Sequence, residues 1–112
     1  MTVSAHFGLT SSQFQAIQQV LANTLNLEQA IIYGSRALGR EKPGSDIDLM
    51  LVGEHFSHTD LLHLMNELDD LLTPYSFDLC RQQDISHPDL LEHIARVGQL
   101  FYQRGLACHS KN

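Results

Sequence analysis

Residues 46–52 impose the tightest constraint on the fold. In this Asp-Ile-Asp-Leu-Met-Leu-Val segment, acidic and apolar residues alternate and then give way to an apolar run. Side chains alternate across a β-strand, so Ile47 and Leu49 would face a core while Asp46 and Asp48 share the opposite face. We therefore expect a sheet with one buried face, which a chain of 112 residues can build as a single domain spanning residues 1–112.

The two aspartates of this strand would carry an electrostatic cost. Asp46 and Asp48 would stand about 7 Å apart on one face. Their repulsion, at an effective dielectric constant of about 20, is roughly 2 kcal/mol. A bound cation would offset that cost, and Mg²⁺ takes one or two carboxylates together with waters and substrate phosphates. The alternative is an edge strand whose outward charges protect against aggregation.

A Gly-Ser pair follows the preceding strand, which we place at residues 28–33. Gly34 permits a close backbone approach, and Ser35 would open a helical turn over residues 35–38 whose free N–H groups favour a phosphate. Gly39 would cap that turn. The glycine spacing is that of a P-loop, but Arg40-Glu41 stands where the Lys-Ser/Thr pair is required. The pair is therefore a candidate phosphate site of another kind.

A third carboxylate, Asp78, belongs to an expected strand at residues 75–80. Phe77 and Leu79 would face the core, which leaves Asp78 on the opposite face. If this strand lies beside residues 46–52, three carboxylates meet there and could hold two Mg²⁺ ions, as in phosphoryl and nucleotidyl transfer. A lone aspartate at the edge of a strand is the alternative explanation.

The remaining pattern predicts three helices and a short last strand. We expect helices from about residue 11 to 25, from 59 to 72 and from 88 to 97, and a final strand at residues 99–102. The order predicts an α/β (α+β) fold: a small mixed β-sheet with helices packed on one face. The other face would be open to solvent, a ligand or a partner.

Composition narrows the function classes. With 13 acidic and 7 basic side chains, the net charge of −6 disfavours autonomous binding of nucleic acid, although Arg36, Arg40 and Lys42 form a local cationic loop suited to a small anion. Cys80 and Cys108 have neither the number nor the spacing of a disulfide framework or metal site. A signal peptide and an apolar run of membrane length are lacking, so we expect a cytoplasmic protein.

The motifs taken together resemble a known superfamily. Gly34-Ser35, ten intervening residues and then Asp46-x-Asp48 are similar to the motif of the DNA polymerase β-like nucleotidyltransferases. The wider stretches are Tyr33-Gly-Ser-Arg-Ala-Leu-Gly-Arg, Ser45-Asp-Ile-Asp-Leu, Phe77-Asp78-Leu79 and Leu91-x-x-Ile94 … Gly98-x-Leu-Phe-Tyr102. They resemble the minimal nucleotidyltransferase (MNT) branch, and the resemblance covers residues 31–102.

The resemblance implies a role for each matching residue. Gly34 and Ser35 would hold the triphosphate of ATP, with Arg36 and Ser45 as helpers. Asp46 and Asp48 would bind both Mg²⁺ ions. Asp78 would complete the metal site and help to deprotonate the acceptor hydroxyl. Of the three carboxylates, Asp78 lies in the least specific motif.

The resemblance also implies a partner. Larger members of the superfamily carry a further domain that shapes the acceptor site, and 112 residues leave no room for one. Minimal nucleotidyltransferases are paired with all-helical HEPN-family proteins as antitoxin and toxin, and transfer AMP from ATP to a tyrosine of the partner. The alternatives are a binding module that neutralises its partner by contact, and an enzyme that acts on a small molecule or RNA.

Overall fold

The helices begin where the sequence supplies local caps. The computed structural model describes residues 7–40, 42, 45–71 and 73–105. Its elements are α1 (Ser11–Ala22), β1 (Gln29–Tyr33), β2 (Ile47–Val52), α2 (His58–Asp69), β3 (Phe77–Arg81), a 3₁₀ turn (Gln82–Asp84), α3 (Pro88–Val97) and β4 (Gln99–Gln103). Thr10 and Gln13 form a capping box at α1, and Ser57 and Asp60 form one at α2. In each box the side-chain oxygen of either residue accepts a hydrogen bond from the backbone N–H of the other, which fixes the start of the helix.

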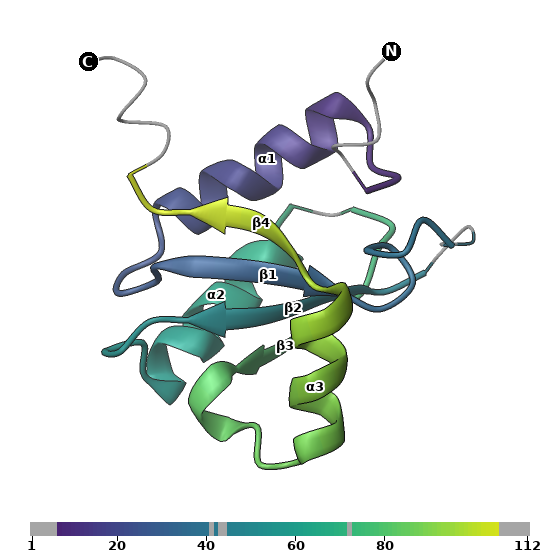
Figure 1. Cartoon of the computed structure of the whole chain (residues 1–112). Helices are drawn as coiled ribbons and strands as arrows, with labels where there is room; N and C mark the ends of the chain where they lie inside the picture. The colour runs from purple at the N-terminus through teal and green to yellow at the C-terminus, as the bar shows by residue number, and fades with distance from the viewer. Residues whose placement is uncertain (1–6, 41, 43–44, 72, 106–112) are drawn as a thin grey trace.

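The four strands form one mixed sheet in the order β3-β2-β1-β4 (Figure 1). β1 is antiparallel to both β2 and β4, whereas β2 and β3 are parallel and joined through α2. The expected small mixed sheet and the α/β fold class are therefore confirmed. Parallel pairing of β2 and β3 requires a long crossover, and α2 supplies it.

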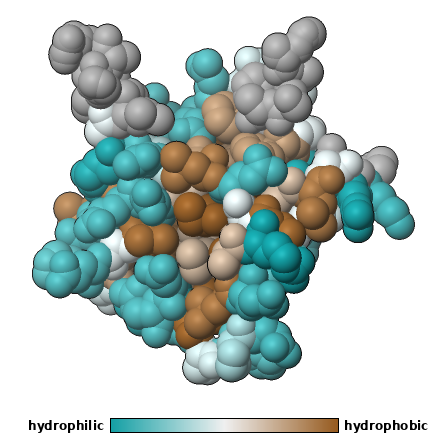
Figure 2. All heavy atoms as spheres, in the orientation of Figure 1, coloured by the Kyte–Doolittle hydropathy of each residue, from teal (hydrophilic) through white to brown (hydrophobic). Residues whose placement is uncertain are grey.

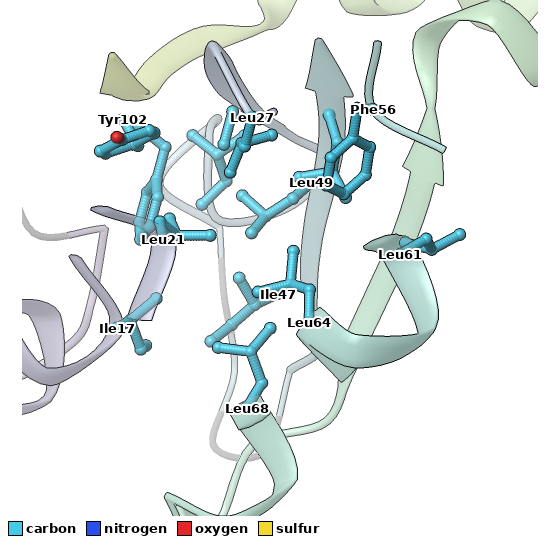
Figure 3. Close-up of a cluster of buried hydrophobic side chains, with 14 of the residues drawn as sticks. Ile17, Leu21, Leu27, Ile47, Leu49, Phe56, Leu61, Leu64, Leu68 and Tyr102 are labelled. Carbon is cyan, nitrogen blue, oxygen red and sulfur yellow. The ribbon is translucent and has the colours of Figure 1, made fainter. Parts of the chain in front are cut away.

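One face of the sheet carries the main hydrophobic core, which α1 and α2 cover (Figure 3). Ile47, Leu49 and Leu51 of β2 are fully buried there, as their alternation predicts. Helix residues complete this layer: Ile17 and Leu21 from α1, and Leu61, Leu64 and Leu68 from α2. Burial of these side chains holds Asp48 of β2 to the other face, because a shift of one residue would exchange the two faces.

The third helix lies on that other face. A Cβ added at Gly98, which follows α3, would come within 2.8 Å of Ile31 Cγ2. The His93 ring of α3 meets the Tyr33 ring edge-on, with centroids 6.3 Å apart. Ile31 and Tyr33 alternate with the core residues of β1, so the expectation that helices cover one face holds for α1 and α2 but not for α3. The chain runs from β3 to β4, which is at the opposite edge of the sheet, and this connection brings α3 across the front of the sheet in Figure 1.

Element boundaries depart from the expectations by a few residues. β2 begins at Ile47, so Asp46 precedes it. β3 begins at Phe77, and before it the Tyr75 N–H donates to Thr73 Oγ1 (3.3 Å). α1 and α2 end at Ala22 and Asp69, earlier than expected. Glu41, Pro43, Gly44 and Cys108 lie outside the described residues. Within the described part of the chain, every helix is too short or too polar to cross a membrane.

Candidate active site

The strand register brings the predicted carboxylates together. Asp48 pairs with Tyr33 on β1 and with Asp78 on β3, so these three residues are aligned across three strands. We call Asp46, Asp48 and Asp78 the carboxylate row. Neighbouring strands lie about 4.8 Å apart, which makes Asp48 and Asp78 immediate neighbours. Asp46 stands exposed at the entrance to β2, Asp78 is exposed, and Asp48 is half-buried. The two strands are thus neighbours, which is the condition under which the sequence brings the carboxylates together.

The negative charges of the row act on Asp48. Burial raises the pKa of Asp48 above its ordinary value, and the negative charges of Asp78 and Asp46 raise this pKa further. The Arg36 guanidinium acts in the opposite direction and lowers the pKa. Asp48 is therefore the carboxylate at which a bound cation would relieve the largest cost.

Gly34 lies directly against Asp48. Its backbone is left-handed (φ +78°), a conformation that disfavours residues with a Cβ. A Cβ at this position would collide with Asp48 Oδ2 and lie 3.3 Å from Asp48 Cγ. The glycine therefore lets the backbone of the phosphate-binding candidate approach the carboxylate row. The motif spacing predicted Gly34 and Asp48 as site residues, but only the fold shows that they are in close contact.

The turn that follows Gly34 is closed in the way the sequence predicts. The Arg40 N–H donates to the Ser35 carbonyl (2.8 Å), and the Gly39 N–H donates to the Arg36 carbonyl (3.3 Å). Gly39 is left-handed (φ +72°), so the pair of bonds is a Schellman motif, the usual end of a helical turn. Ser35 is thereby held at the start of this turn, beside the carboxylates.

Arg36 has structural partners that sequence reasoning missed. Its side chain is buried: Nε and Nη2 donate to the Ser45 carbonyl (3.3 and 3.0 Å), and Nη1 donates to the Phe7 carbonyl (2.9 Å). Its guanidinium carbon also stands 4.7 Å from the centroid of the Tyr75 ring. Arg36 thus fastens the backbone immediately before Asp46. A phosphate-contacting role for Arg36 stays a prediction, since no sequence pattern distinguishes the two uses of an arginine.

Replacement of Arg36 by methionine should destabilise the fold by about 2–4 kcal/mol, because it leaves buried carbonyls unpaired. Urea unfolding monitored by circular dichroism measures this loss. Arg40→Met, at an exposed position four residues later, is the matched control and should change the free energy of unfolding by about 0.5 kcal/mol or less. Equal losses for both variants would contradict the positioning role of Arg36.

Ser45 also has local partners. Its hydroxyl accepts a hydrogen bond from the Lys42 N–H (2.7 Å), and its own N–H donates to the Lys42 carbonyl (2.9 Å). These bonds close the loop that leads into β2. The predicted contact between Ser45 and a phosphate stays a prediction, as do the roles of Gly34 and Ser35 in binding the triphosphate.

The residues of the row fit a hard cation with few protein ligands. Among the described residues, no three His, Cys, Asp or Glu side chains lie close enough together to enclose a metal ion. Mg²⁺ commonly takes one or two carboxylates and fills its remaining positions with water and phosphate oxygens. Asp46 and Asp48, adjacent on one face and with the pKa of Asp48 raised, match that requirement. Asp78 is their neighbour on β3.

Three half-buried side chains, Tyr33, Cys80 and His93, form a wall beside the carboxylate row. The Tyr33 hydroxyl reaches Cys80 Sγ (3.6 Å), and His93 of α3 packs against the Tyr33 ring. Burial raises the pKa of Tyr33, and so do its bond to Cys80 and the negative charge of Asp78. Alternation along β1 and β3 could have placed Tyr33 and Cys80 on this face, but no sequence signal identifies His93.

Comparison with known proteins agrees with this geometry. The family model of the polymerase beta nucleotidyltransferases matches residues 15–105. A comparison with curated protein sequences gives no match. The motif residues and the carboxylate row all lie within the matched segment.

Solved structures share the fold. A crystal structure of a toxin–antitoxin with AMP-PNP has a TM-score of 0.66 at 20% identity, over 80% of this chain and 73% of that one. A complex of a tri-AMPylated Shewanella oneidensis HEPN toxin with an MNT antitoxin gives 0.62 at 16% identity, over 90% and 78%. The MntA-HepT toxin–antitoxin gives 0.61 at 17% identity, over 88% and 76%. The family match over most of the chain, with this fold and motif, shows that the protein belongs to the polymerase beta nucleotidyltransferase family.

Proposed function

We propose that the protein is a Mg²⁺-dependent nucleotidyltransferase that transfers AMP from ATP to a hydroxyl, and that the acceptor is a tyrosine of a HEPN-family partner. The row of Asp46, Asp48 and Asp78 beside Gly34 carries the proposal. An acidic row costs stability, and it becomes useful only when cations and phosphates occupy it. The acceptor is inferred from the MNT–HEPN complexes that share the fold, one of which contains an AMPylated toxin.

Each residue has a defined part in this reaction. The Gly34-Ser35 turn binds the triphosphate through its backbone, and Asp46 and Asp48 hold Mg²⁺. When bound, Mg²⁺ supplies positive charge that stabilises the negative charge of the phosphates. Asp78 orients the acceptor hydroxyl and accepts its proton.

The proposed reaction is a nucleophilic displacement at phosphorus. The acceptor oxygen forms a bond to the α-phosphorus of ATP, and the bond from that phosphorus to the bridging oxygen breaks. Pyrophosphate leaves with the electron pair, and the acceptor carries AMP. Positioning of the two reactants by the site accounts for much of the expected acceleration.

Intact-mass spectrometry tests the proposal. The full chain is incubated with ATP, Mg²⁺ and the product of the adjacent gene as the candidate partner, and we expect AMP-sized mass increases on the partner. Asp46→Asn should abolish them, while Asp69→Asn, at an exposed aspartate of α2, should leave them unchanged. A partner that is inhibited without a mass change, equally by the wild type and by Asp46→Asn, would mean that the protein acts as a binding module.

A further inference from the structure

Charge is distributed unevenly along this chain. All 7 basic and 13 acidic side chains occur from Glu28 onward, so residues 1–27 contain no Asp, Glu, Lys or Arg. That segment includes the whole of α1, and β4 has no charged residue either. The α1 and β4 sequences instead combine glutamines with apolar residues. Depletion of charge is typical of the core of a protein interface.

The two uncharged elements lie side by side, although far apart in sequence (Figure 1). Gln18 Nε2 of α1 donates to the Phe101 carbonyl of β4 (2.6 Å). A groove of about 470 Å³ runs between the elements and is lined by Gln15, Gln19, Ala22, Leu100 and Gln103, among others. We call this surface the α1–β4 face. Leu100 is 45% exposed and pairs with Ile31 of β1, and Figure 2 shows apolar residues over β4 and β1 on the side of the sheet that α3 crosses.

The two edge strands of the sheet, β3 and β4, differ in charge. β3 carries Asp78 and Arg81, and Arg81 pairs with Asp84 (2.8 Å) in the turn that follows. These charges guard that edge against pairing with another chain. β4 has a strand neighbour on one side only among the described residues, and its sequence Gln-Leu-Phe-Tyr-Gln contains no charge. An unguarded edge beside an apolar groove is suited to association.

We propose that the α1–β4 face is where two copies of this chain associate, about a two-fold axis that sets α1 and the edge of β4 against the same elements of the second copy. Each copy carries a net charge of −6, so two copies repel wherever charged surfaces meet. The α1–β4 face is the surface at which this repulsion is least. A two-fold contact is self-complementary, and amides and apolar side chains satisfy that condition without opposite charges.

This association leaves the candidate active site free. In the strand order β3-β2-β1-β4, the carboxylates lie on β3, on β2 and just before β2, whereas the α1–β4 face is at the opposite edge. A dimer would therefore present two carboxylate rows that remain accessible to acceptors. The inference is independent of the proposed function, because it uses neither the carboxylates nor a nucleotide.

Sedimentation velocity of the full chain tests the inference. From low to high micromolar concentration, the wild type should shift from the 12.6 kDa species to one of twice that mass. Leu100→Lys should raise the dimer dissociation constant at least about tenfold, because it buries an ammonium group in the contact. Leu62→Lys is the matched control: Leu62 on α2 is 46% exposed, and its replacement should leave dimerisation unchanged.

Each result of this experiment either supports or overturns the proposed dimer. Gln19→Lys, at an exposed position on α1, replaces Leu100→Lys if the latter fails to fold by circular dichroism. A wild type that stays monomeric throughout overturns the proposal, and so does a dimer that both face variants leave intact. A monomer whose capture of the HEPN-family protein is lost in Leu100→Lys would assign the face to a different partner, and the proposal would then also be wrong.

Discussion

Asp48→Asn is expected to lower the rate of nucleotidyl transfer at least about a thousandfold, and at the same time to make the metal-free protein more stable. Asparagine keeps the shape of the side chain but removes the charge that would hold Mg²⁺. The same charge is the one that the fold disfavours: burial, Asp78 and Asp46 all raise the pKa of Asp48. Activity and stability should therefore change in opposite directions in one variant.

The pH dependence of stability follows from the direction of that shift. Because the pKa of Asp48 is higher in the folded than in the unfolded chain, the folded state binds more protons between the two values. The Asp48 contribution to the free energy of unfolding should therefore fall as pH rises through this window, from about pH 4 upward. Above it the cost is fully present, so at neutral pH Asp48→Asn should raise the Tm by about 2–5 °C.

Thermal unfolding at several pH values, with and without Mg²⁺, measures these effects. Mg²⁺ should stabilise the wild type and leave Asp48→Asn unchanged, because a ligand of the folded state alone raises its stability. Asp69→Asn serves as control, because Asp69 is exposed on α2, away from the row, and its replacement should alter neither activity nor the response to Mg²⁺. An Asp48→Asn variant that is destabilised, or still active, would refute the role given to this carboxylate.

Local sequence predicted those parts of the fold that local forces determine. The alternation in residues 46–52 and the periodic patterns that begin near residues 11 and 88 predicted one strand and two helices, and the structure confirms β2, α1 and α3. The motif spacing also identified the residues that the sheet brings into one row. The strand alternation and the helix starts depend on interactions that act within a few residues along the chain.

The remaining features depend on contacts between distant segments. Arg36 is buried because the Phe7 and Ser45 carbonyls converge on it, and neither is a neighbour in sequence. The wall of Tyr33 and His93 exists because α3 crosses the face opposite the main core. An amphipathic pattern shows that a helix covers apolar surface, but it does not say which face of the sheet that surface belongs to.

Gly34→Ala should destabilise the protein by about 2–4 kcal/mol, whereas Gly39→Ala should cost only about 1 kcal/mol. Both glycines are left-handed, with φ of +78° and +72°, so a new Cβ meets similar backbone strain at each. They differ in their surroundings. A Cβ at Gly34 collides with the Asp48 carboxylate, while at Gly39 it has nothing within 4 Å. The difference between the two losses therefore measures the close approach to Asp48, and urea unfolding determines both.

A double-mutant cycle locates the source of that difference. Asp48→Ala removes the carboxylate but keeps Cβ, which would lie 3.7 Å from the Cβ of Ala at position 34, an ordinary contact distance. In the Asp48→Ala background, Gly34→Ala should therefore cost only as much as Gly39→Ala, which implies a coupling energy of about 1–3 kcal/mol between positions 34 and 48. Gly39→Ala should cost the same in both backgrounds. If Gly34→Ala were equally costly with and without the Asp48 carboxylate, backbone strain alone would explain its effect, and direct contact between the Gly34 turn and the carboxylate row would be disproved.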